Sequence, residues 1–255
     1  MSTDGVACAG AAPRRDGAEA GSVRAGRRRM LACSLAILCI AIGRPASADL
    51  LVDLTAAVRN DRADEVKALL ARGMDPDSVD QGGDPMLCIA ARNGYAATTI
   101  ALLDAHAKPN LANRSGDTPL MLAALHGSLA IVRALQSRGA QMNPDGWTPL
   151  IYAATGGHDD VVNFLIDHGA NLDAESPNGT TALMMAIHEH HPATARLLVE
   201  RGADVRHRNQ SGASALSWAM RGNETDVAEL LRQAGATQSP SYRSPKRLRA
   251  TGTDP

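Results

Sequence analysis

The stretch "GDTPLMLAALHG" at residues 116–127 is the part of the sequence that decides the fold. It returns as "GWTPLIYAATGG" at 146–157, and three further stretches align with it without gaps. These are "GDPMLCIAARNG" (83–94), "GTTALMMAIHEH" (179–190) and "GASALSWAMRGN" (212–223). Their first glycines lie 33, 30, 33 and 33 residues apart. A nearly constant period of this length predicts a row of similar units that stack on one another.

Each part of the repeated unit has a physical role. Thr118 and Thr148 precede a proline, so each hydroxyl can cap the start of a helix whose first position tolerates proline. The small residues that follow allow neighbouring helices to approach closely. A second apolar stretch, such as "VVNFLIDHG" at 161–169, ends in a glycine that can adopt the left-handed helix-terminating conformation. The pattern predicts two short helices per unit and a polar linker between units.

The T-P-L-x-x-A-A core at a period near 33 resembles the ankyrin-repeat family from about Asp49 to Ala236. The resemblance implies an all-α ankyrin-repeat solenoid of about six helix–turn–helix units with short β-hairpin fingers. The low aromatic content, 2%, also fits small helices better than a β-sandwich or barrel. We place the units at about 49–81, 82–114, 115–144, 145–177, 178–210 and 211–238.

The sequence departs from the family pattern in the residue that follows T-P-L. Histidine is usual there and links neighbouring units, but this chain has Cys88, Met121, Ile151, Met184 and Ser217. The substitution predicts apolar packing and puts the usual polar network between repeats in doubt. Cys88 therefore falls on a packing position, and we expect a buried, inert thiol.

The finger "QMNPDGW" at 141–147 is three residues shorter than the others. Trp147 follows the shortened turn, in the place that Asp84, Asp117, Thr180 and Ala213 occupy in other repeats. These mostly polar counterparts indicate a position facing solvent. Two interpretations stay open: Trp147 anchors a partner, or it folds over the gap that the short finger leaves.

Residues 1–48 have the layout of a secretory signal peptide. Arg27, Arg28 and Arg29 precede an apolar run of 14 residues, Met30 to Gly43, and Ala46-Ser47-Ala48 ends the segment in a small-x-small pattern. A transmembrane anchor is the alternative, but the run is shorter than the roughly 20 residues that span a bilayer. We expect cleavage after Ala48, no stable membrane span afterwards, and a periplasmic or secreted protein that resembles exported bacterial ankyrin-repeat proteins. A cytosolic protein with a misread N-terminus is a third hypothesis.

Removal of the leader leaves Cys88 as the sole cysteine, so no internal disulfide is possible. It also leaves 19 basic and 24 acidic residues, a net charge of −5. An acidic surface with few rings is unsuited to nucleic acid, which requires basic stripes and stacking platforms. The segment 239–255 is rich in Pro, Ser and Arg and has nothing to pack, so we expect a disordered, solvated tail.

The stretch "HEHHP" at 188–192 suggests a metal site, and metal binding through the His188–His191 cluster is the alternative function. The spacing does not match H-E-x-x-H, because the fourth residue after His188 is Pro192. In register, His190 takes the place of the glycine that ends the first helix in other repeats, and Pro192 begins the second helix. The sequence also contains no nucleophile elbow and no phosphate-binding loop, so we expect no enzymatic activity and no cofactor.

The resemblance implies a scaffold that binds one or more proteins through the concave face and the finger tips. We expect the exported form to be monomeric. Transferred residue by residue, the family's contact positions fall at Arg114, Ser115, Asp117, Leu125, His126, Trp147, Thr155, Asn178, Thr180, His188, Glu189, Gln210 and Arg221.

Overall fold

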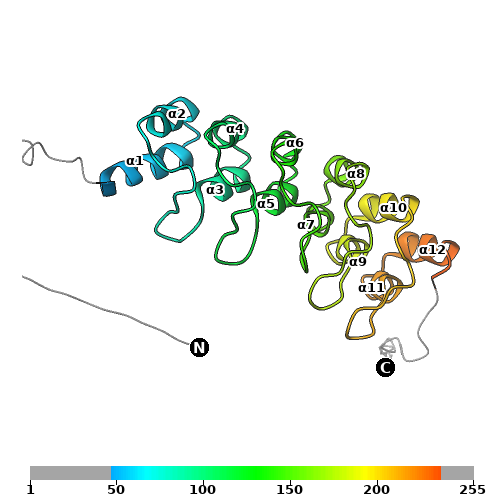
Figure 1. Ribbon diagram of the computed structural model, residues 1–255. Helices are drawn as coiled ribbons and strands as arrows, with labels where there is room; N and C mark the ends of the chain where they lie inside the picture. Colours follow the sequence, from blue (N-terminus) through cyan, green and yellow to red (C-terminus); the bar gives the residue numbers. More distant parts are fainter. Residues whose placement is uncertain (1–46, 237–255) are drawn as a thin grey trace, which may run out of the picture. The chain divides into compact units, whose positions relative to one another are not determined.

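The computed structural model describes residues 47–236, which form twelve α-helices in six consecutive pairs (Figure 1). The predicted signal peptide lies outside the described residues except for its last two, and the predicted tail 239–255 lies wholly outside them. The first helices of the pairs are α1 (Ser47–Arg59), α3 (Met86–Arg92), α5 (Pro119–Leu125), α7 (Pro149–Gly156), α9 (Ala182–His188) and α11 (Ala215–Arg221). The second helices are α2 (Ala63–Ala71), α4 (Ala96–Asp104), α6 (Leu129–Ser137), α8 (Asp159–Asp167), α10 (Pro192–Glu200) and α12 (Thr225–Gln233).

The helices form two layers. Each first helix packs against the first helix of the next pair, and each second helix packs likewise against its successor. The loops between pairs project away from the second-helix layer (Figure 1). The all-α repeat architecture predicted from the period is confirmed.

The predicted helix caps are present. Thr118 Oγ1 accepts a hydrogen bond of 3.3 Å from the amide of Met121, and Thr148 Oγ1 accepts one of 3.3 Å from the amide of Ile151. In each case proline occupies the first helical turn. Ser214 caps α11 in the same way, which sequence reasoning did not single out.

The core is a continuous apolar seam between the two layers. Paired alanines of the first helices, such as Ala123–Ala124 and Ala153–Ala154, are fully buried. Their small size lets neighbouring helices lie close together. Larger side chains from both layers, including Leu135 and Leu165, fill the remaining space. Cys88 belongs to this buried set, as expected.

The fingers form hairpin turns with minimal β pairing. Residues 47–236 contain no β-strand, and the finger pairing is limited to isolated bridges at Val79–Pro85 and Arg208–Ser214. A side chain at the base of each full-length finger competes with strand pairing: Asn113 Oδ1, for example, accepts from the amides of Ser115 and Asp117, both at 2.9 Å. The fingers are therefore tight hairpin turns, closed by a backbone bond such as that from the Asn113 amide to the Asp117 carbonyl at 3.0 Å and by these side-chain bonds.

One ladder of hydrogen bonds joins successive fingers. Asn143 donates to the carbonyl of Gly169 at 2.9 Å and accepts from the amide of Asn171 at 2.7 Å. Asn110 makes the same two bonds to Gly139 and Gln141. At the equivalent positions of other repeats, Asp77 accepts from the amide of Lys108 and Asp173 from that of Asp204.

A second ladder joins the repeats at the start of the second helix. His158 Nε2 lies 3.0 Å from the carbonyl oxygen of Leu125, and His191 Nε2 lies 3.0 Å from that of Thr155. Tyr95 bonds the carbonyl of Arg59 from the equivalent position. The polar network that the missing T-P-L histidines put in doubt is therefore present, but it comes from a different position of the repeat.

Candidate protein-binding surface

The predicted contact residues lie on one surface, which we call the finger-side surface. It consists of the finger residues 113–117, 143–147, 176–180 and 209–213 and the exposed side chains of the first-helix layer beside them. Nine of the thirteen predicted contacts are exposed there: Arg114, Ser115, His126, Trp147, Asn178, His188, Glu189, Gln210 and Arg221. Asp117, Leu125 and Thr155 are half-buried, and Thr180 is buried.

Trp147 lies beside the short finger and is 38% exposed. Its ring meets that of Tyr152 edge to face, with centroids 5.9 Å apart and planes at 78°. The two rings line a pocket of about 220 Å³ together with Leu125, Thr155 and Met185. Trp147 therefore packs on its own repeat and also presents an open aromatic surface, which fits an anchor for another protein.

Tyr152 also ties this surface to the preceding repeat. Its hydroxyl donates a hydrogen bond to Asp117 Oδ1, and the other oxygen of Asp117 accepts one from Asn113 Nδ2 at 3.1 Å. Burial, this hydrogen bond and the Asp117 charge raise the pKa of Tyr152. The phenol is therefore neutral and is fixed in orientation against Trp147.

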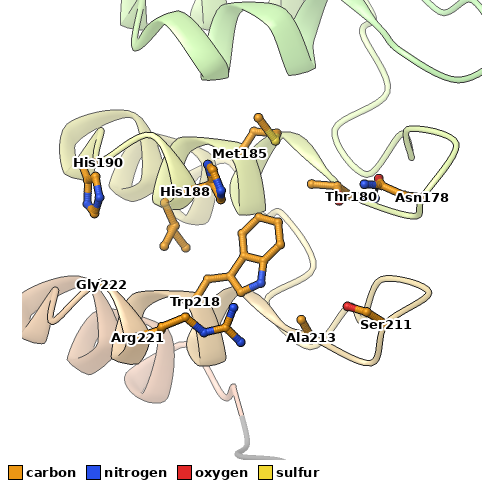
Figure 2. Close-up of a pocket in the computed structure, with 11 residues that line it drawn as sticks. Asn178, Thr180, Met185, His188, His190, Ser211, Ala213, Trp218, Arg221 and Gly222 are labelled. Atoms are coloured by element: carbon orange, nitrogen blue, oxygen red, sulfur yellow. Dashed lines mark hydrogen bonds between the residues drawn. The ribbon is translucent and has the colours of Figure 1, made fainter. Parts of the chain in front are cut away.

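A larger pocket of about 540 Å³ lies between the fifth and sixth repeats (Figure 2). The Trp218 ring of α11 points toward Met185 and His188 of α9, and the centroids of Trp218 and His188 are 5.2 Å apart at 61°. Arg221 and Ala213 also line the pocket. Met185 lines both pockets, so the two pockets adjoin on the surface of repeats four to six.

Tyr152, Met185 and Trp218 were missing from the predicted contacts. They occupy one position of the repeat, four residues after the residue that caps the first helix. The second and third repeats have the buried Ile89 and Leu122 there. The residues 47–236 contain five aromatic side chains, and three of them (Trp147, Tyr152, Trp218) line these pockets. That concentration of a scarce residue type was a usable signal.

The three histidine side chains of "HEHHP" contact three different partners. His188 Nδ1 lies 2.9 Å from Glu189 Oε1, His190 Nδ1 lies 2.6 Å from Glu224 Oε1 in the next repeat, and His191 contacts the previous repeat as described. His190 has φ of 60°, so the predicted left-handed turn is confirmed, and Pro192 begins α10. Among the described residues, no group of three or more His, Cys, Asp or Glu side chains is placed to hold a metal ion. The three imidazoles of the alternative hypothesis do not converge.

The surroundings of Cys88 keep its thiol protonated and unreactive. Burial, together with the charges of Asp84 and Asp117, raises the pKa of its thiol to about 12. The sulfur lies 3.4 Å from the carbonyl oxygen of Leu111. A thiol that stays protonated at neutral pH is a poor nucleophile and a poor metal ligand.

Comparison with known proteins agrees with the stacked pairs, the capped first helices and the fingers. The family model for ankyrin repeats (3 copies) matches residues 54–145, 87–176, 139–209 and 171–241. The chain belongs to the ankyrin-repeat family. Its ankyrin repeats are similar to the ankyrin repeat domain of human ASB11, with 30% identity, a TM-score of 0.67, and coverage of 72% of this chain and 84% of that one. They are also similar to an ankyrin repeat domain from Acinetobacter baumannii AYE, with 29% identity, a TM-score of 0.65, and coverage of 72% and 98%. No curated protein sequence matches the chain.

Ankyrin repeats generally mediate protein–protein interaction, and the finger-side surface of this chain has the shape for it. Both pockets are partly open to solvent. Within residues 47–236 no helix is long and apolar enough to cross a membrane. The arrangement is suited to recognising the side chains of another protein.

Proposed function

We propose that this chain is an exported, non-enzymatic scaffold that binds another protein through its finger-side surface. The observation that carries the proposal is the set of aromatic side chains, Trp147, Tyr152 and Trp218, that line the adjoining pockets of repeats four to six. Aromatic side chains that are anchored at one edge and open at the other are frequent centres of binding energy in protein interfaces. The rest of the surface supplies polar contacts around them.

Export is proposed from the order of positive charge, short apolar run and Ala46-Ser47-Ala48. Cleavage after Ala48 would make Asp49 the first residue, in the first turn of α1, where a carboxylate favours the helix. The test is the N-terminal sequence of the protein recovered from a bacterial periplasmic fraction. An intact Met1 in the cytosol would contradict export.

The binding proposal is tested by crosslinking and pull-down from native envelope extract. We expect Trp147→Ala to lose partner proteins that the wild-type chain retains, because it removes the exposed ring without touching the capped helices. The matched control is Arg196→Ala, which changes an exposed residue of the second-helix layer. If both variants retain the same proteins as the wild type, the finger-side surface does not carry the function.

The monomeric state is part of the same proposal and is tested separately. Sedimentation of the exported form should give a single species near the mass of one chain across a wide concentration range. A concentration-dependent dimer that disappears in Trp147→Ala would mean that a second copy occupies the surface.

A further inference from the structure

An ion pair of the second repeat has lost its acidic member at the equivalent positions of the sixth repeat, beside the large pocket. In the second repeat, Nη1 of Arg92, the last residue of α3, pairs at 2.8 Å with Oδ2 of Asp84, which precedes the helix. In register with the period, Arg221 of the sixth repeat corresponds to Arg92, and Ala213 corresponds to Asp84. The sixth repeat has therefore kept the cation and replaced its carboxylate by a methyl group.

The guanidinium of Arg221 therefore lines the pocket without a carboxylate partner among the described residues. The Arg221 side chain is exposed and makes no hydrogen bond or ion pair with the other residues between 47 and 236. Ala213 and Arg221 line the same pocket, whose lining contains no Asp or Glu. Two carboxylates lie against the histidines that line the pocket: Glu189 Oε1 is 2.9 Å from His188 Nδ1, and Glu224 Oε1 is 2.6 Å from His190 Nδ1.

An apolar wall stands beside this cation. The Trp218 ring of α11 lies between Arg221 and the side chains of Met185 and His188 of α9 (Figure 2). A ligand that satisfies both features carries a carboxylate and, close to it, a large apolar side chain. Charged pairs of arginine and carboxylate are favoured by matched geometry and by partial exclusion of water.

We propose that this pocket receives an acidic segment of a partner protein, in which an Asp or Glu side chain pairs with Arg221 and a neighbouring apolar side chain packs on Trp218 and Met185. This inference rests on the proposed protein-binding function and names the chemistry that one part of the surface recognises. The partner's carboxylate takes the role that Asp84 plays toward Arg92.

The shape of the pocket favours an internal segment of the partner over its C-terminus. The lining runs from the finger residues Asn178 and Ser211 to His190 and Gly222 at the far end of the first helices. A chain can therefore cross the surface and leave on both sides.

The described residues also carry 23 acidic and 15 basic groups, so an acidic segment gains no general attraction from the surface. Its binding must depend on local contacts with Arg221.

The experiment uses the full chain and an array of nine-residue peptides, acetylated and amidated at their ends. Glycine and serine flanks surround two variable positions separated by one residue, and each position runs through all twenty amino acids. A second copy of the array carries free C-terminal carboxylates. We expect binding to concentrate on capped peptides that pair Asp or Glu with Leu, Met, Phe or Trp.

Two variants make the test specific. Ala213→Asp should pair with Arg221 as Asp84 pairs with Arg92, and we expect it to weaken binding of acidic peptides by about tenfold or more. Arg221→Glu should shift the preference toward Lys and Arg. The matched controls on α10 are Ala193→Asp and Arg196→Glu, which make the same charge changes on exposed positions of the second-helix layer and should leave binding unchanged.

The outcomes separate this inference from the proposed function. No bound peptide, no preference for acidic peptides, or equal binding by Ala213→Asp and Ala193→Asp would overturn the inference. A preference confined to free C-termini would also overturn it, because the proposal requires an internal side chain. Peptides that bind without an acid preference and are lost in Trp218→Ala would leave the protein-binding function standing.

Discussion

The hydroxyl of Tyr152 donates a hydrogen bond to the carboxylate of Asp117, which lies one repeat earlier in the chain. This bond joins the third and fourth repeats at the place where the finger between them is three residues short. The Tyr152 ring also supports Trp147. One residue therefore links the stability of the stack to the shape of its binding surface.

Tyr152→Phe should lower the free energy of unfolding by about 1–3 kcal/mol, because it removes the hydroxyl and leaves the partly buried Asp117 with one bond fewer. The ring contact with Trp147 is retained, so Trp147 fluorescence should change little. Urea unfolding followed by circular dichroism measures the first quantity. A variant as stable as the wild type would show that water replaces the bond without cost.

Asn143 offers a graded test of the finger ladder. Asn143→Ala removes both bonds to the next finger and should cost about 1–2 kcal/mol, whereas Asn143→Asp keeps the acceptor for the Asn171 amide and should cost less. Asp77 and Asp173 show that a carboxylate can fill this position. The urea midpoints should rank wild type, Asp and Ala in that order. Equal midpoints for Asp and Ala would contradict the role of the acceptor.

His190 stands in a left-handed backbone conformation, with φ of 60°. Both His190→Gly and His190→Val lose the contact with Glu224, so the comparison between them isolates the backbone. Val should be less stable than Gly by about 1–2 kcal/mol, because a branched side chain clashes in this conformation. The control is the same pair of variants at Glu189, where φ is −89° and Gly should hold no such advantage.

Cys88 should resist thiol reagents in the folded chain and react fully in urea. The test uses a chain in which Cys8, Cys33 and Cys39 are serine, so that one thiol is counted. Since the folded pKa is raised from 9.0 to about 12, the folded state holds its proton where the unfolded state releases it. The stabilisation is complete below pH 9 and is lost as the pH rises from 9 to 12. Equal reaction rates with and without urea would contradict the burial of this side chain.

Zinc should neither bind the native chain stoichiometrically nor raise its unfolding temperature. His188, His190 and His191 have separate partners, and no fourth ligand lies beside them in the described part of the chain. Metal analysis after dialysis, with and without EDTA, measures binding, and His188→Ala provides the comparison. A stoichiometric zinc that is lost in His188→Ala would restore the metal hypothesis.

The sequence predicted those features that each repeat determines by itself. The caps of Thr118 and Thr148 and the left-handed turn at His190 follow from local backbone chemistry, and the period gave the order of the helices. The ladders through Asn143 and His158 escaped prediction because they depend on how one repeat is placed on the next. The fingers keep only single antiparallel bridges, at Val79–Pro85 and Arg208–Ser214, because side chains such as Asn113 bind backbone amides of the turn.

The candidate surface was predicted less completely than the fold. Trp147 was found because it interrupts a row of mostly polar residues, and the structure leaves it both packed and open. Trp218 and Met185 were missed because an apolar residue on a helix is ordinarily assigned to the core. Only the three-dimensional stack shows that their position of the repeat is buried at Ile89 and Leu122 but open further along.

The two ladders have a consequence for how a bound partner affects the rest of the chain. Each polar link in them reaches from one repeat to an adjacent one, so a partner seated on repeats five and six slows local opening there far more than in repeats one and two. Amide hydrogen exchange along the chain would then fall off in steps with distance from the partner. The exchange rates of successive repeats would then show which repeats the partner contacts.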